Sequence, residues 1–158
     1  MVRSGKKWWK VVDLMIMFMG EYNHTVDAKG RIIVPSKFRE KLGESFVITK
    51  NLDHCLAIYD KENWENLQPK LAQMTILSEA SRTLRRMIVG SAAEAETDKQ
   101  GRVLIPAPLR EYAKIEKDAV LIGNIDHIEI WSKEEWKKAQ EIDADEAAEK
   151  LYESGITL

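Results

Sequence analysis

The sequence predicts an α+β protein, mainly β, in which one small unit occurs twice. Three observations predict this class. A 14-residue motif recurs further along the chain, each copy joins a turn to a run of β-branched residues, and apolar residues at helical spacing lie between and after the copies. With 158 residues, 44% of them hydrophobic and 32% charged, the chain has the composition of an ordinary globular protein.

The repeat is the strongest pattern in the chain. Residues 27–40 (DAKGRIIVPSKFRE) align without a gap with residues 98–111 (DKQGRVLIPAPLRE), an offset of 71 residues. Six pairs are identical: Asp27 and Asp98, Gly30 and Gly101, Arg31 and Arg102, Pro35 and Pro106, Arg39 and Arg110, and Glu40 and Glu111. A looser similarity continues to Trp64 and Trp136. We therefore place one repeat at residues 21–64 and the other at 93–136.

Each copy opens with a pattern typical of a β-hairpin. Residues 22–26 alternate between apolar and polar, Asp27 is an Asx-turn former, Gly30 accepts a positive φ, and residues 32–34 are β-branched. Pro35 ends the second strand. The second copy repeats these structural positions with Asp98, Gly101 and Pro106. The pattern predicts one hairpin in each copy.

The next part of each copy reads as a short helical turn followed by a strand pair. In copy one the turn ends at Gly43, and in copy two Pro108 stands where a first-turn proline is tolerated. The expected strand pairs are 46–48 with 56–59, and 119–122 with 128–131. Ser132 and Glu135 match a capping box, which predicts that a helix begins there.

Two helical segments lie outside the repeats. Apolar residues at helical spacing predict a helical connector at 65–92, in which Pro69 limits or kinks the first helix. Residues 137–158 form an acidic tail with the pattern of a solvated amphipathic helix. Residues 1–16 are expected to be disordered or to precede the true start, with Met17 or Met19 as the first residue.

Composition limits the classes of function. The formal net charge is -2, so a nucleic-acid partner depends on where the positive charges lie. The single cysteine, Cys55, leaves no intramolecular disulfide and suits the cytoplasm. His54 and His127 recur at equivalent places before a strand, which favours a role in the fold over a metal or catalytic site. We find no pattern of a nucleophile, a phosphate loop or a zinc site, so we expect no enzyme and no cofactor.

The basic residues favour DNA contact through copy one. Residues 29–41 carry five basic side chains against Glu40, whereas residues 100–112 carry two against Glu111. The candidate DNA-binding residues are Arg31 first, then Lys29, Arg102, Lys99 and Lys37. Arginine can bind guanine with two hydrogen bonds, and lysine neutralises phosphate. Spacing alone leaves an alternative open, in which Arg31 and Arg102 only form ion pairs with Asp27 and Asp98.

The repeated Asp-x-x-Gly-Arg pattern, followed by three apolar residues, Pro, and then Phe or Leu with Arg, resembles the swapped-hairpin DNA-binding domain of the AbrB type. Two such units in one chain resemble the MraZ family of bacterial transcription regulators. The resemblance runs from Met17 through Trp136 and omits residues 1–16 and the acidic tail. Copy two lacks several basic residues of copy one, so equal DNA contacts by both copies do not follow.

The resemblance implies a double-split β-barrel built from the two repeats, self-association into closed rings, and association with the nucleoid. It also implies sequence-specific binding of double-stranded DNA at short direct repeats upstream of the division and cell-wall gene cluster. No membrane and no small-molecule substrate are expected. The alternative function is a ring-forming interaction protein, or antitoxin-like module, whose hairpins bind protein.

Overall fold

The computed structural model describes residues 17–157, so the prediction for residues 1–16 lies outside the described part. The fold is α+β, as predicted, and its strands are antiparallel. The strands are β1 Phe18–Thr25, β2 Arg31–Ile33, β3 Phe46–Lys50, β4 Leu56–Asp60, β5 Ala93–Ala95, β6 Arg102–Leu104, β7 Asp118–Ile125 and β8 His127–Ser132. The helices are α2 Ser36–Leu42, η1 Leu52–His54, α3 Lys61–Ala72, α4 Glu79–Gly90, α5 Ala107–Tyr112, α6 Lys133–Ala139 and α7 Ala144–Glu153.

The two repeats are interlocked. Six strands form one sheet in the order β1-β7-β8-β4-β3-β5, and β2 pairs with β6 in a separate two-stranded ribbon. The predicted pairs β3–β4 and β7–β8 are present within the repeats. Four further pairs, β1–β7, β4–β8, β3–β5 and β2–β6, each join a strand of one repeat to a strand of the other. Neither repeat therefore has a complete sheet of its own.

The predicted hairpin within each copy is wrong. The turn closes as expected, because the amide of Gly30 donates to the carbonyl of Asp27 at 3.0 Å. Beyond the turn, however, β1 pairs with β7 and β2 pairs with β6 instead of with each other. In copy two the segment before the turn, β5, pairs with β3. Pairing between repeats lets both units bury their apolar residues in one core, which a unit of about 40 residues does poorly alone.

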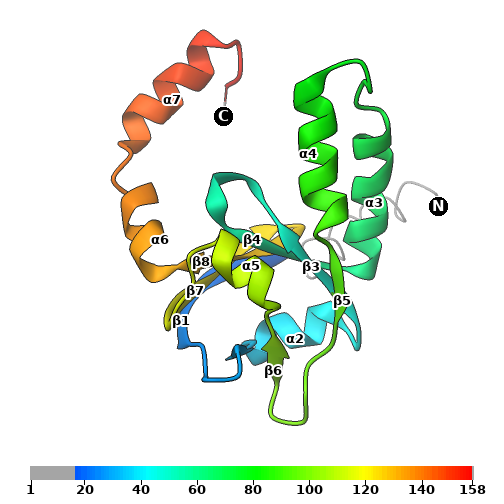
Figure 1. Cartoon of the computed structure of the whole chain (residues 1–158). Coiled ribbons are helices and arrows are strands. Elements are labelled where there is room, and N and C mark those ends of the chain that lie inside the picture. Colours follow the sequence, from blue (N-terminus) through cyan, green and yellow to red (C-terminus); the bar gives the residue numbers. More distant parts are fainter. Residues whose placement is uncertain (1–16, 158) are drawn as a thin grey trace, which may run out of the picture.

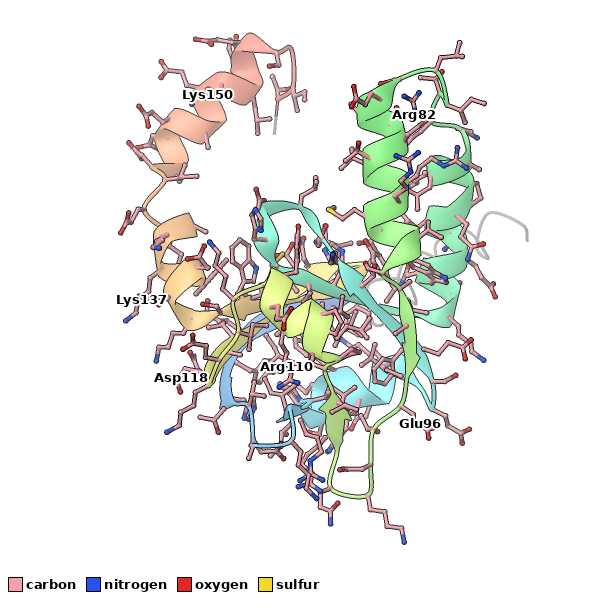
Figure 2. All side chains as sticks on the ribbon, in the orientation of Figure 1. Arg82, Glu96, Arg110, Asp118, Lys137 and Lys150 are labelled. Atoms are coloured by element: carbon pink, nitrogen blue, oxygen red, sulfur yellow. The ribbon has the colours of Figure 1, made fainter. Side chains whose placement is uncertain are left out.

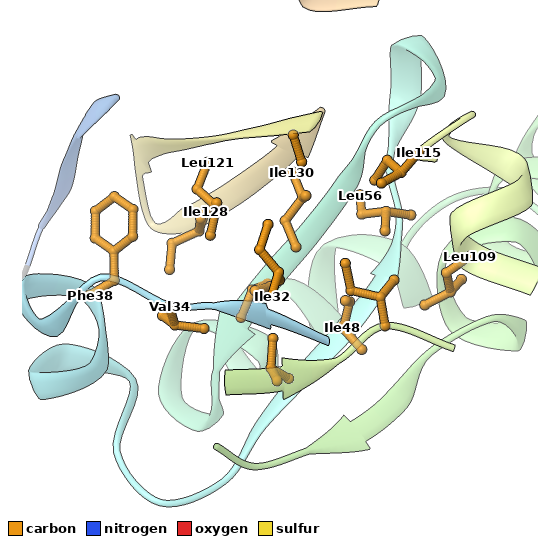
Figure 3. Close-up of a cluster of buried hydrophobic side chains, with 14 of the residues drawn as sticks. Ile32, Val34, Phe38, Ile48, Leu56, Leu109, Ile115, Leu121, Ile128 and Ile130 are labelled. Carbon is orange, nitrogen blue, oxygen red and sulfur yellow. The ribbon is translucent and has the colours of Figure 1, made fainter. Parts of the chain in front are cut away.

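The core lies between the ribbon and the sheet. Figure 3 shows Ile32 and Val34 directed at Leu121, Ile128 and Ile130 of the sheet. All five side chains are fully buried. The same cluster includes Val103 of β6, Ile105 directly after β6, and Phe38, Leu42 and Leu109 of α2 and α5. Burial of each such side chain contributes about 1.5–3 kcal/mol, so the shared core fixes the ribbon against the sheet.

The helices begin and end where local chemistry places them. Pro35 and Pro106 precede α2 and α5, and Gly43 ends α2 with a φ of 78°. The predicted helix start at Ser132 is confirmed, since the Ser132 hydroxyl accepts from the amide of Glu135 at 3.2 Å, while the Glu135 carboxylate pairs with Lys114 and Lys138. In Figure 1, α3 and α4 rise above the sheet at the right of the view, and α6 and α7 rise above it at the left. Within residues 17–157, no helix is both long and apolar enough to cross a membrane.

Both histidines at equivalent positions pack on aromatic rings. His54 stacks on Tyr112 with ring centroids 5.0 Å apart, and His127 stacks on Tyr59 at 5.2 Å. His127 also contacts two carboxylates, Asp126 at 2.7 Å and Glu129 at 3.4 Å. Burial opposes protonation, but the hydrogen bonds with Glu129 and Asp126 outweigh it and raise the pKa of His127.

Because the pKa of His127 is raised on folding, its imidazolium stabilises the folded state below about pH 6.5, and this contribution is lost as pH rises through the folded pKa. Replacing His127 with Gln is therefore expected to lower the free energy of unfolding more at about pH 5.5 than at about pH 8.5. Urea unfolding at both pH values measures the difference. An equal loss at the two pH values would contradict an ion pair at His127.

Candidate nucleic-acid interface

The outer face of the β2–β6 ribbon presents arginines between aliphatic side chains. Strand alternation turns Ile32 and Val103 into the core, which leaves their neighbours on the opposite face. There the register pairs Arg31 with Leu104, and Ile33 with Arg102. Ile33 and Leu104 are 44% and 55% exposed. We call these four residues, Arg31, Ile33, Arg102 and Leu104, the ribbon face.

Two Asx turns fix the arginines of the ribbon face. One Asp27 carboxylate oxygen accepts from the amides of Lys29 and Arg31, both at 2.9 Å, and the other accepts from the Arg31 Nε at 2.8 Å. Asp98 binds Gln100 and Arg102 in the same way. The hydrogen bond from the following arginine's amide, partly opposed by desolvation, lowers the pKa of each aspartate. Both carboxylates therefore stay ionised and hold their arginines near neutral pH.

The ion pairs leave the side chains of both arginines partly exposed. Arg31 meets Asp27 through Nε, and its side chain remains 29% exposed. Arg102 meets Asp98 through Nε in the same way, and its Nη1 lies 3.9 Å from the carboxylate of Asp27, across the boundary between repeats. The ion pairs considered in the sequence analysis are thus present, and they orient the arginines on an accessible face.

The other sequence-predicted residues lie around the ribbon face at the surface. Lys29 and Lys99 are exposed in the two turns, and Lys37 is exposed in the first turn of α2. The counterpart of Lys29 in the second turn is Gln100, whose side chain accepts from Arg102 at 3.3 Å. Three of the five basic candidates, Lys29, Arg31 and Lys37, thus belong to copy one, and two, Lys99 and Arg102, belong to copy two.

Arg39 and Arg110 have a role that sequence reasoning missed. Arg110 of α5 reaches the turn between β1 and β2, as Figure 2 shows, and Arg39 of α2 reaches the equivalent turn of the other repeat. A Cβ on Gly30 would lie 2.7 Å from the Arg110 Cζ, and a Cβ on Gly101 would overlap the Arg39 guanidinium. The recurrence of both arginines at one offset was the only available signal.

These crossing contacts explain why both turns need glycine. Gly30 and Gly101 have φ values of 85° and 78°, in the left-handed region that side chains disfavour. Each glycine also leaves room for the guanidinium of the other repeat. The Arg110 Nε is buried and has no hydrogen-bond partner in residues 17–157, so the contact adds positive charge beneath the first turn. Each turn is thus supported by a helix of the opposite repeat.

Cys55 does not have the environment of a nucleophile. The thiol is 1% exposed and donates to the carbonyl of Leu52 at 3.3 Å. Burial, assisted by the nearby charges of Glu129 and Asp53, raises the pKa of the thiol far above its ordinary value. A reactive cysteine needs the thiolate at neutral pH, so Cys55 is a packing residue.

Comparison with known proteins places the chain in a family. A family model described as "MraZ protein, putative antitoxin-like" matches twice in tandem, at residues 17–87 and 88–156. The chain belongs to the MraZ family. The two tandem matches of the family model agree with the repeat in the sequence and with the interlocked strands of the structure.

Relatives in the MraZ family match nearly the whole chain. Proteins named "Transcriptional regulator MraZ" from Thermoanaerobacter sp. (strain X514) and Clostridium tetani (strain Massachusetts / E88) are 50% and 51% identical to it over 143 and 142 residues. In both cases the match covers 89% of this chain and 100% of the relative. A third relative of the same name, from Lachnoclostridium phytofermentans, is 50% identical over 90% of this chain and all of its own length.

Proposed function

We propose that the protein is a transcriptional regulator that binds double-stranded DNA sequence-specifically through the ribbon face. The observation that carries the proposal is the pair of oriented, accessible guanidinium groups on a two-stranded antiparallel ribbon. The major groove of B-DNA admits such a ribbon and presents a distinct donor and acceptor pattern for each base pair. The names of the relatives support the regulator role.

The residues divide into two roles. Arg31 and Arg102 approach base edges or phosphates, and Ile33 and Leu104 offer apolar contact of the kind that recognises the thymine methyl group. The exposed lysines, Lys29, Lys99 and Lys37, neutralise phosphates and fix the register of the ribbon on the duplex. Since Gln100 replaces Lys29 in the second turn, we expect copy one to make more phosphate contacts.

We extend the proposal to the arrangement in the cell. The ribbon packed over the sheet supports a double-split β-barrel for the paired repeats. We propose that the protein is cytoplasmic and nucleoid-associated, self-associates into rings, and acts on short direct repeats upstream of the division and cell-wall gene cluster. A ring suits direct repeats because each added subunit binds the next repeat at a high effective concentration, so modest single contacts become tight binding.

The test is selection of bound duplexes from a random pool at physiological salt, followed by affinity measurements on the enriched sequence. We expect one motif to be enriched and its affinity to fall about 100-fold between 50 and 200 mM salt if about four phosphates are contacted. A pool without enrichment at every salt concentration would reject the DNA-binding function. That result would favour the antitoxin-like alternative, in which the ribbon face binds protein.

A further inference from the structure

Each turn of the ribbon contains one buried residue, although both turns lie at the surface. Gly30 and Gly101 are buried, whereas the residues directly before them are exposed. Each glycine lies against the guanidinium of an arginine from the opposite repeat, Arg110 at Gly30 and Arg39 at Gly101. Glycine permits this close approach because it has no side chain. We call Arg39 and Arg110 the crossing arginines.

Arg110 presents the flat face of its guanidinium to the first turn. A Cβ on Gly30 would lie 2.7 Å from the Arg110 Cζ, 2.8 Å from Nη1 and 3.0 Å from Nε. Because Cζ is nearest and both nitrogens are only slightly farther away, the plane of the group lies over the glycine. Arg39 approaches differently, since a Cβ on Gly101 would meet its Nη1 first. Within residues 17–157, neither crossing arginine forms an ion pair that would draw it away from its turn.

Helix α5 holds Arg110 in this place. Leu109, directly before it, is buried in the shared core. At the end of the helix, the Tyr112 hydroxyl donates to the carbonyl of Asn51 at 2.6 Å, and the Tyr112 ring stacks on His54. Asn51 and His54 lie between β3 and β4 of the first repeat. The helix that carries Arg110 is therefore anchored on the same repeat whose turn it contacts.

Gly30 links this contact to the ribbon face. Its carbonyl accepts from the amide of Ile105 at 2.9 Å, and its amide donates to the carbonyl of Asp27 at 3.0 Å. Arg31 follows directly, and its amide donates to the Asp27 carboxylate at 2.9 Å. A shift of Gly30 would therefore change the direction in which the Arg31 side chain leaves the ribbon.

We propose that Arg110 is a positioning residue for DNA recognition, which fixes the first turn so that Arg31 meets the duplex in one orientation. Arg39 does the same for Arg102 at the second turn. A side chain that is already ordered binds more tightly, because binding does not have to order it. The inference rests on the proposed DNA-binding function and adds that the DNA contact of each repeat depends on a helix of the other.

Hydrogen exchange of the full-length protein without DNA tests the support of the turns. Arg110→Ala is expected to speed exchange in the first turn at least about fivefold and to leave the second turn unchanged, and Arg39→Ala should do the reverse. Mass spectrometry of peptides that span residues 27–31 and 98–102 reads both turns in one sample. A general loss of stability would speed exchange in both turns. Equal changes in the two turns, or no change in either, overturn the proposal.

A double-mutant cycle tests the consequence for DNA binding. Arg110→Ala is expected to weaken binding to the selected duplex at least about tenfold, but less than about threefold in an Arg31→Ala protein, because Arg110 acts through Arg31. In an Arg102→Ala protein the tenfold loss should persist, since Arg110 does not contact the second turn. Equal losses in all three backgrounds would mean that Arg110 does not act through Arg31, and they overturn the proposal.

Arg110→Lys keeps the charge and the long side chain, so it decides the question even if Arg110→Ala does not fold, which circular dichroism checks. An ammonium group has no flat face, so we expect the lysine variant to show the exchange pattern and the loss of affinity of the alanine variant. Wild-type behaviour of Arg110→Lys would overturn the role of the guanidinium. Arg86→Ala is the control that removes one exposed arginine from α4, and it should change affinity less than about twofold.

The outcomes separate this inference from the function on which it rests. A wild-type protein that binds no duplex rejects the proposed function and this inference together. A wild-type protein that binds its duplex, with uncrossed exchange or additive losses in the cycle, rejects this inference alone.

Discussion

Replacing both Arg31 and Arg102 with alanine is expected to weaken binding to the selected duplex by about 2–6 kcal/mol, since each well-placed arginine contributes about 1–3 kcal/mol of base recognition. This is roughly a 30- to 20,000-fold loss of affinity. Both side chains are part of exposed ion pairs with Asp27 and Asp98, and such pairs contribute only about 0–1 kcal/mol to folding. Fluorescence anisotropy with labelled duplex measures the affinity.

A matched control removes two other positive charges, Lys61 and Lys137, which are exposed on α3 and α6. It should change affinity much less, because only nonspecific attraction is lost. Replacing Arg31 and Arg102 with lysine distinguishes phosphate contact from base contact. The affinity for the duplex is retained if the arginines contact phosphate, and it is lost if they bind a base with two hydrogen bonds. Unchanged affinity in the double alanine variant, with self-association intact, would remove the ribbon face as the DNA-binding site.

Local chemistry made many elements predictable from the sequence. The Asx turn at Asp27, the end of α2 at Gly43 and the helix start at the N-cap Ser132 depend on neighbouring residues alone, and all three are present. The choice of strand partner was not predictable in the same way. The β-branched run at 32–34 indicates a strand, but pairing with β6 joins residues 71 positions apart and depends on how the whole core is filled.

The candidate site, like the fold, was predictable where it depends on neighbouring residues and not where it depends on contacts between the repeats. Sequence identified Arg31 and Arg102 because they recur beside turn residues, and the structure places both on one face. It did not identify the contacts of Arg39 and Arg110, whose guanidinium groups reach a turn only because the repeats interlock. Each turn contacts a helix of the other repeat, so the conformation of each turn depends on an arginine of the other repeat. A substitution at one crossing arginine is thus expected to affect the turn of the opposite copy.

The second large effect concerns Gly123, a position that no sequence pattern distinguishes. It faces Gly20 across the β1–β7 pair, and a Cβ at Gly123 would lie 2.5 Å from the Met19 Cα and 2.6 Å from the carbonyl carbon of Phe18. Backbone atoms cannot rotate aside as a side chain can, so β1 must separate from β7. Phe18, now 1% exposed, would then lose part of its burial.

We therefore expect Gly123→Ala to lower the free energy of unfolding by about 2–4 kcal/mol, which combines overpacking with partial exposure of a phenylalanine. The melting temperature should fall by about 5–15 °C for a chain of this size. The matched control is Gly90→Ala, whose added Cβ would meet nothing within 4 Å at the end of α4 and should change stability by less than about 1 kcal/mol. Since β1 and β7 belong to different repeats, a Gly123→Ala protein as stable as the Gly90→Ala control would mean that this pairing does not hold the two repeats together.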